Sequence, residues 1–255
     1  MHISKFVAEL IGTAILIVLG DGVVANVLLS KTKGNGAGWI VITFGWGMAV
    51  FVGVFCIQNY NSGAHLNPAV TLAMAVGHKL EWNMVLPYMG AQMLGAMLGA
   101  MVVYVFYSDH FRATEDKDLK LAVFCTGPNI RNPGLNFLCE VIGTFLLIFP
   151  IFLMVDPSVA MDVGAPAPHN MKMGLGALGA LPVGLLVFAI GMSLGGTTGY
   201  AINPARDLGP RIMHAIMPIP GKRDSDWGYA WVPVIGPLVG GLLAAAAAKA
   251  ISPMS

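Results

Sequence analysis

Two segments of the chain carry the same triplet, Asn67-Pro68-Ala69 and Asn203-Pro204-Ala205. Asparagine is a preferred cap just before a helix, and proline fits the first helical turn because the N–H that it lacks would have no partner there. Each triplet therefore predicts a helix that begins at its asparagine. A helix start presents unpaired N–H groups and the positive end of the helix dipole. Two such starts facing each other would repel cations, hydronium included, and would offer two asparagine amides as hydrogen-bond donors to a neutral molecule that carries oxygen.

The elements that must position these triplets are long and apolar. Of the 255 residues, 56% are hydrophobic and 11% are charged, whereas about 25% of an ordinary soluble domain is charged. Six stretches reach the length of about 20 apolar residues that crosses a bilayer: 4–29, 38–58, 83–107, 136–155, 177–196 and 229–251. This pattern predicts an all-α protein embedded in the lipid bilayer.

The charge balance and the cysteines exclude other classes. The 14 Lys and Arg nearly cancel the 13 Asp and Glu, so there is no basic surface for nucleic acid. The three cysteines have no metal-binding spacing. We therefore expect neither a metal nor a cofactor.

Half-helices follow the two triplets. The apolar stretches 67–77 and 203–215 are too short to span a bilayer, so they predict helices that enter the membrane without crossing it. Arg206 lies three residues after Asn203, on the first turn of the second half-helix. A charge at that depth is expensive unless it faces water or a partner. Arg206 therefore either lines an aqueous path or forms an ion pair with its neighbour Asp207.

The order of these elements repeats along the chain. A Glu-x-x-Gly-Thr sequence opens a long span at Glu9 and again at Glu140. We divide the chain into two repeats of three spans and one half-helix each, 1–125 and 126–255, within one domain. Because three is odd, the second repeat crosses the membrane in the opposite direction, which places a site near the midplane. A buried carboxylate can act as a proton relay, but its recurrence in both repeats favours a scaffold role, accepting hydrogen bonds from the loop before the half-helix.

Other features concern packing. The connection 108–135 is the most polar segment and is expected to be a loop. Asp21 is expected near the end of the first span, with no further role.

Small residues recur at a spacing of four on the third and sixth spans and predict close helix crossings: Ala91, Gly95, Gly99, Gly236, Gly240 and Ala244.

The chain resembles the major intrinsic proteins, the aquaporin family, and within it the glycerol-conducting branch. The resemblance covers nearly the whole chain and rests on the segments 62–71 and 199–207 around the triplets and on the two Glu-x-x-Gly-Thr sequences. It implies six transmembrane helices plus two half-helices in an inverted repeat, with a pore that runs past both triplets. The backbone lining of that pore would come from Gly63, Ala64, His65 and Leu66 and from Gly199, Ala201 and Ile202. His65 would line the inner mouth or brace its loop.

The resemblance also implies a selectivity filter of four residues: Trp46, Gly191, Tyr200 and Arg206. Water-selective relatives usually carry His where this chain has Gly191, so the position is expected to be open. Tyr200 stands where glycerol channels commonly have Phe, and its hydroxyl would narrow the filter or add a donor and acceptor. The chain also has one extra residue between Trp46 and Asn67 relative to the commonest spacing. If the insertion lies elsewhere than in the turn 58–61, Phe44 or Gly47 replaces Trp46.

Orientation and assembly follow from the same resemblance. Lys and Arg are concentrated in the odd-numbered loops, which by the positive-inside rule alone would put both termini outside. The family implies both termini in the cytoplasm, and we follow it because Arg206 and the order of the half-helices fix the topology more specifically than a charge count. It also implies a homotetramer in the plasma membrane with one pore per subunit.

The leading functional hypothesis is a passive channel for glycerol, water and other small neutral solutes that excludes protons and ions. The alternative is a proton-coupled secondary transporter that uses Glu9 or Glu140. An enzyme is disfavoured, because no nucleophile and base or metal cluster lies near the triplets.

Overall fold

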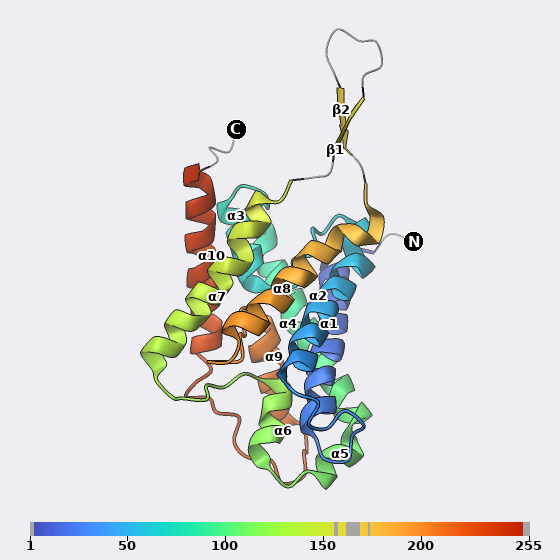
Figure 1. Cartoon of the computed structure of the whole chain (residues 1–255), viewed down its shortest axis with the longest axis vertical. Helices are drawn as coiled ribbons and strands as arrows, with labels where there is room; N and C mark the ends of the chain where they lie inside the picture. The colour runs from blue at the N-terminus through green and yellow to red at the C-terminus, as the bar shows by residue number, and fades with distance from the viewer. Residues whose placement is uncertain (1–2, 156–157, 162–168, 173, 252–255) are drawn as a thin grey trace.

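The computed structural model describes residues 3–155, 158–161, 169–172 and 174–251 (Figure 1). Within this part of the chain six helices are long and apolar enough to cross a membrane. They are α1 (Lys5–Leu28), α2 (Trp39–Ile57), α4 (Val85–Phe106), α7 (Pro133–Leu153), α8 (Leu181–Leu194) and α10 (Val232–Ile251), and 3-10 turns extend α2, α4 and α8 at Gln58–Tyr60, Trp82–Met84 and Gly176–Ala180. The predicted all-α membrane fold with six spans is confirmed. The expectation that both termini lie in the cytoplasm concerns residues 1–2 and 252–255, which are outside the described residues.

Two shorter helices begin at the triplets. Helix α3 (Pro68–Val76) is capped by Asn67, whose side-chain oxygen accepts a hydrogen bond from the N–H of Ala69 at 2.8 Å. Helix α9 (Pro204–Ile216) is capped by Asn203, which accepts from the N–H of Ala205 at 3.0 Å. The half-helices expected over 67–77 and 203–215 therefore begin at the expected residues, for the reason that their cap chemistry gives.

Small residues bring the long helices together in two matching pairs. Helix α4 packs on α1 so closely that a Cβ added at Gly95 would lie 2.3 Å from the carbonyl oxygen of Leu10. Helix α10 packs on α7 in the same way, because a Cβ at Gly240 would lie 2.4 Å from the carbonyl oxygen of Val141. The predicted close crossings are confirmed at both glycines, where only the absence of a side chain allows the backbones to approach.

The polar connection 108–135 is not simply a loop, so that expectation is wrong. It contains α5 (Ser108–Ala113) and α6 (Lys117–Phe124). Asp116 caps α6 by accepting from the N–H of Asp118 at 2.8 Å, and Phe124 stacks on Phe111 in the interior. The helices form because the segment carries a cap and an apolar face in addition to its charges.

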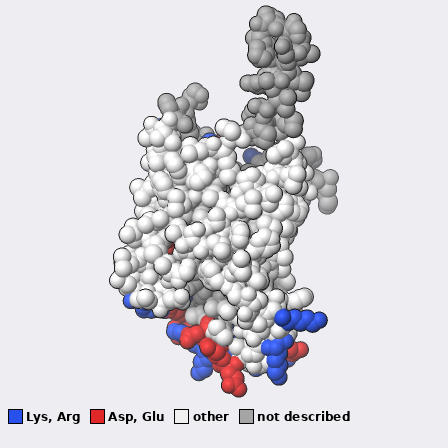
Figure 2. Space-filling view, in the orientation of Figure 1, with Lys and Arg blue, Asp and Glu red and all other residues white. Residues whose placement is uncertain are grey.

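Charged side chains gather at the end of the molecule that α5 and α6 form, while the visible sides of the bundle carry almost none (Figure 2). Exposed members of this patch are Asp109, Arg112, Glu115, Asp116, Lys117 and Asp118. At the opposite end an antiparallel hairpin projects, formed by β1 (Ser158–Met161) and β2 (His169–Lys172), with Ser158 opposite Lys172 (Figure 1). The hairpin had no counterpart among the expected elements.

Candidate functional site

The two half-helices meet start to start in the interior. The side-chain N–H of Asn67 donates to the carbonyl of Ile202 at 2.8 Å, and that of Asn203 donates to the carbonyl of Leu66 at 2.8 Å. Each asparagine thus caps its own helix with its oxygen and holds the opposite loop with its nitrogen. Since an amide nitrogen carries two hydrogens, one N–H of each asparagine is left for a molecule beside it. Both residues line the same cavities.

Glu9 braces the loop before α3. Its two carboxylate oxygens accept hydrogen bonds from the backbone N–H groups of His65 at 2.9 Å and Leu66 at 2.8 Å. The side chain of Gln92 donates to Glu9 at 2.9 Å. A fully buried carboxylate with three donors has its charge satisfied by fixed partners. Its oxygens are therefore engaged in holding the loop.

Glu140 does the same for the loop before α9. It accepts from the backbone N–H groups of Ala201 at 3.1 Å and Ile202 at 2.9 Å, and from the hydroxyl of Thr198 at 2.7 Å. The two carboxylates therefore make equivalent contacts in the two halves of the chain.

The loops need this support because their backbone is strained. Ala64 (φ 48°) and Leu66 (φ 52°) adopt left-handed conformations, as do Tyr200 (φ 38°) and Ile202 (φ 43°). Residues with side chains rarely adopt such angles, and they persist only where surrounding contacts hold them. The carboxylates and the crossed asparagine bonds supply those contacts.

Three cavities follow one another past these loops. A cavity of about 450 Å³ beside α6, called the outer cavity, and one of about 330 Å³ beside the loop before α3, called the inner cavity, are separated by a narrow space of about 40 Å³. The narrow space shares Trp46, Tyr200 and Arg206 with the outer cavity, and Asn67 and Asn203 with the inner one. The constriction therefore lies between the aromatic residues and the paired asparagines.

The expected pore-lining residues divide among these cavities. Gly63, Ala64, His65 and Leu66 line the inner cavity, Ala201 and Ile202 the narrow space, and Gly199 the outer cavity. The ring of His65 also contacts the hydroxyl of Thr71 at 3.2 Å, so it both faces the cavity and braces α3. Pro68, Ala69, Pro204 and Ala205 are buried at the helix starts instead.

Arg206 lies against Trp46 in the constriction. The centre of its guanidinium is 4.0 Å from the centroid of the indole ring. The ring packs on α1, where a Cβ at Gly20 would be 2.2 Å from Trp46. Phe44 instead is half exposed on the surface, and Gly47 packs against Gly184. Of the three candidates, Trp46 is the one whose ring lies against Arg206.

Tyr200 occupies the space beside Gly191. A Cβ at Gly191 would lie 2.7 Å from Cζ of Tyr200 and 2.8 Å from its hydroxyl oxygen. The expectation that this position is open is therefore wrong, because the phenol fills the space that the glycine leaves. The hydroxyl oxygen is buried, so the ring and not the hydroxyl faces the cavities. Gly191 itself is not among the residues that line the three cavities.

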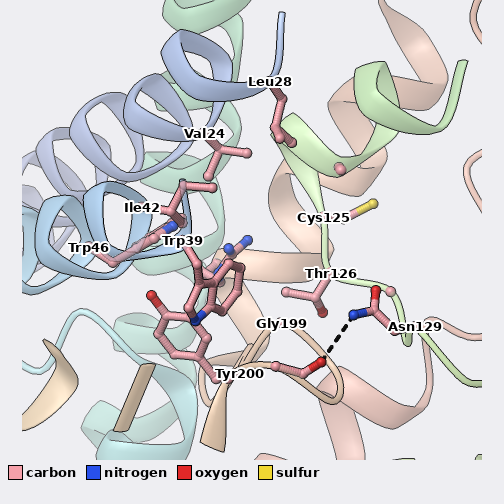
Figure 3. A pocket seen from close by; sticks show the side chains of 15 residues that line it. Val24, Leu28, Trp39, Ile42, Trp46, Cys125, Thr126, Asn129, Gly199 and Tyr200 are labelled. Atoms are coloured by element: carbon pink, nitrogen blue, oxygen red, sulfur yellow. Dashed lines mark hydrogen bonds between the residues drawn. The ribbon is translucent and has the colours of Figure 1, made fainter. Parts of the chain in front are cut away.

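Trp39 also lines the outer cavity, next to Tyr200, and the sequence analysis did not identify it as a site residue. Its ring meets Tyr200 edge to face at 5.9 Å, and its indole N–H donates to the carbonyl of Gly191 at 3.0 Å. Figure 3 shows Trp39 and Tyr200 close together, with Thr126 and Asn129 across the outer cavity. The signal was its position seven residues before Trp46, which places both indoles on one face of α2.

Arg206 does not pair with Asp207. That carboxylate accepts from Nε of Arg211 at 2.8 Å and from the backbone N–H and hydroxyl of Thr126, both at 2.7 Å. Among the described residues, the carboxylate within ion-pair distance of Arg206 is that of Asp21, at 3.9 Å. Asp21 lies inside α1 and is fully buried, so its expected place at the end of the helix is wrong.

Comparison with known proteins agrees with this geometry. The family described as Major intrinsic protein matches residues 1–247. A probable glycerol uptake facilitator protein of Thermotoga maritima is 53% identical over 242 residues, which cover 95% of this chain and 97% of the relative. A D/L-lactic acid transporter of Lactiplantibacillus plantarum is 39% identical over 247 residues, with 95% of each chain covered. The X-ray structure of the aquaglyceroporin from Plasmodium falciparum superposes with a TM-score of 0.79 at 31% identity, covering 98% of this chain and 96% of that one.

The family match and the relatives span nearly the whole chain rather than one motif. Together with the six apolar helices, they make the protein a multi-pass membrane protein. The chain belongs to the major intrinsic protein family.

Proposed function

We propose that the protein is a passive channel for glycerol, water and other small neutral solutes. The observation that carries the proposal is the constriction, where the rings of Trp46 and Tyr200 and the guanidinium of Arg206 border a narrow space between two wider cavities. Aromatic faces suit the carbon backbone of a polyol, and fixed guanidinium donors suit its hydroxyls. Relatives named as glycerol uptake facilitators support this substrate class.

A solute passes the constriction singly and is not chemically changed. It exchanges part of its hydration for donors on Arg206 and then for the free amide hydrogens of Asn203 and Asn67. The starts of α3 and α9 present positive dipole ends at the same depth, which opposes protons and cations.

We further propose the assembly and topology that the family implies. The division into inverted repeats 1–125 and 126–255, the homotetramer and the plasma membrane are part of this proposal. With both termini in the cytoplasm, the charged patch on α5 and α6 faces outside, since α1 begins and α10 ends toward the other end of the bundle (Figure 1).

Stopped-flow light scattering on proteoliposomes tests the function. Glycerol flux well above that of protein-free vesicles, without a change in internal pH, is expected. Negligible glycerol flux beside fast water flux would place the protein among water-selective channels. Uptake against a glycerol gradient that stops when the proton gradient is collapsed would favour the coupled transporter. The engagement of Glu9 and Glu140 by backbone donors argues against that alternative.

A further inference from the structure

Two arginines and two aspartates are buried on the side of the paired asparagines that faces α6. Arg211 and Asp207 are fully buried and directly hydrogen-bonded at 2.8 Å. The other two, Arg206 and Asp21, approach to 3.9 Å without a hydrogen bond. Each guanidinium thus has one carboxyl group within 4 Å.

Among the described residues, Asp21 has no hydrogen-bond partner that would give it a structural role. Both carboxylate oxygens of Asp21 are buried and accept no hydrogen bond from the described residues. The Nη1 atom of Arg206 is also buried and donates no hydrogen bond to the described residues. A carboxylate in a membrane-spanning helix is costly unless a charge or donors offset it. Within the described residues the cation within 4 Å of Asp21 is Arg206.

The neighbours of Asp21 fix how it meets the guanidinium. Gly20, the preceding residue, accommodates the indole of Trp46, and the guanidinium of Arg206 lies over that indole. Asp21 approaches the same guanidinium at Nη1. Arg206 therefore has the ring on one face and the carboxyl group of Asp21 near one nitrogen, and it lines the outer cavity and the constriction.

We propose that Asp21 is a positioning residue that acts as the counter-charge of Arg206 in the constriction. An uncompensated guanidinium beside the positive ends of α3 and α9 would attract small anions. The carboxylate offsets that charge while the guanidinium keeps its hydrogen-bond donors, so the constriction favours neutral hydroxylated solutes over anions. This role rests on the proposed function, because it requires that solutes pass Arg206.

The Asp21→Asn variant tests the counter-charge, since it keeps the shape of the side chain and removes its charge. Nitrate, a small permanent anion, is the probe, applied as its potassium salt to proteoliposomes with valinomycin to carry the compensating potassium. We expect nitrate permeability to rise about tenfold, equivalent to a barrier lower by about 1.4 kcal/mol, while glycerol permeability changes less. The matched control is Asp109→Asn, which removes one acidic charge from exposed α5 and is expected to leave nitrate exclusion unchanged.

Unchanged nitrate permeability in folded Asp21→Asn would overturn the proposal. If that variant does not fold, the double variant Asp21→Asn with Arg206→Gln decides, because removing both charges restores the balance. The proposal expects the double variant to fold and to exclude nitrate, and a double variant as unstable as the single one would reject it. If the wild-type protein conducts no glycerol, the proposed function is rejected. The glycerol measurement tests the proposed function, whereas the nitrate measurement tests the role of Asp21, so the two failures can be distinguished.

Discussion

The phenol of Tyr200 lies in the space that a side chain at Gly191 would need, with the missing Cβ only 2.7 Å from Cζ of the ring. The two residues come from different elements, α8 and the loop before α9. Trp39 contacts both residues, since its ring packs on the ring of Tyr200 and its indole N–H donates a hydrogen bond to the carbonyl oxygen of Gly191. Gly191 therefore shapes the constriction indirectly, by determining where the aromatic ring can lie.

Substituting Gly191→Ala should push Tyr200 toward the constriction. The new Cβ would also lie 3.0 Å from Cγ2 of Thr43, and Trp39 packs on the ring of Tyr200, so the ring has little other room. We expect glycerol permeability to fall several-fold and water permeability to fall less, because glycerol is the larger solute. Stopped-flow measurements of both solutes on the same vesicles give the ratio directly.

The double variant Gly191→Ala with Tyr200→Ala should recover glycerol flux, because the displaced ring is gone. Gly179→Ala, just before α8 and with no atom within 4 Å of its added Cβ, serves as the control. Equal losses of glycerol and water in Gly191→Ala would contradict this account of the constriction.

The substitutions Glu9→Gln and Glu140→Gln should destabilise the protein. Each carboxylate accepts two backbone N–H groups from a loop in a strained conformation, and a glutamine would turn an NH₂ group toward one of them. A buried donor left without an acceptor costs about 1–3 kcal/mol. Thermal unfolding in detergent should show a lower midpoint for both variants, whereas Glu81→Gln, an exposed acid, should match the wild type.

The same variants separate a scaffold from a proton relay. A scaffold role predicts that whatever protein remains folded conducts glycerol downhill, with no dependence on a proton gradient. A folded, stable Glu9→Gln protein that loses only uptake driven by a proton gradient would show that the relay interpretation is the correct one.

The sequence predicts the spans and the half-helix starts because their causes are local. Length and apolarity define a span, and the asparagine and proline at 67–68 define a helix start without reference to the rest of the chain. The short helices at 108–113 and 117–124 also had local signals, but the count of charges concealed the cap at Asp116 and the apolar face that follows.

The contacts in the constriction could not be predicted in the same way. The position of Tyr200 beside Gly191 and that of Asp21 beside Arg206 depend on how separate elements pack and on which way each side chain points. The family resemblance supplied positions for the filter, but not the direction of a side chain that differs from the usual residue, as Tyr200 does.

The glycine contacts between helices predict a large cost for a single methyl group. In Gly95→Ala the new Cβ would lie 2.3 Å from the carbonyl oxygen of Leu10, so α4 and α1 must separate. Overpacking of this kind costs about 1–3 kcal/mol. Gly240→Ala should cost a similar amount, because its Cβ would approach the carbonyl oxygen of Val141 to 2.4 Å.

Gly90→Ala is the matched control on α4, because a Cβ there meets no atom within 4 Å. Alanine is the better helix former by up to about 1 kcal/mol, so this variant should be as stable as the wild type or slightly more so. Thermal unfolding of the three variants in one detergent makes the comparison. Equal stability of Gly95→Ala and Gly90→Ala would show that α1 and α4 are not held in close contact.

Cys125 predicts pH-dependent inhibition by thiol reagents. Cys125 is a residue of the outer cavity's wall, and its thiol is buried and contacts the carbonyl oxygen of Leu121, whereas Cys56 is exposed on α2 and lines none of the three cavities. Burial raises the pKa of the Cys125 thiol, and the thiolate is the reactive form. Below that raised pKa the thiolate fraction grows about tenfold per unit of pH, so inhibition by a small maleimide should be slow at pH 7 and faster at pH 9.

Glycerol flux after timed exposure to the reagent measures the effect. The Cys125→Ser variant should resist inhibition at both pH values, while Cys56→Ser should be inhibited like the wild type. Cys125 lies in the wall of the cavity that leads to Trp46 and Arg206, so an adduct that displaces this wall should reduce water and glycerol flux alike. Inhibition that persists in Cys125→Ser but disappears in Cys56→Ser would place the sensitive thiol on the surface of α2 and contradict the prediction for Cys125.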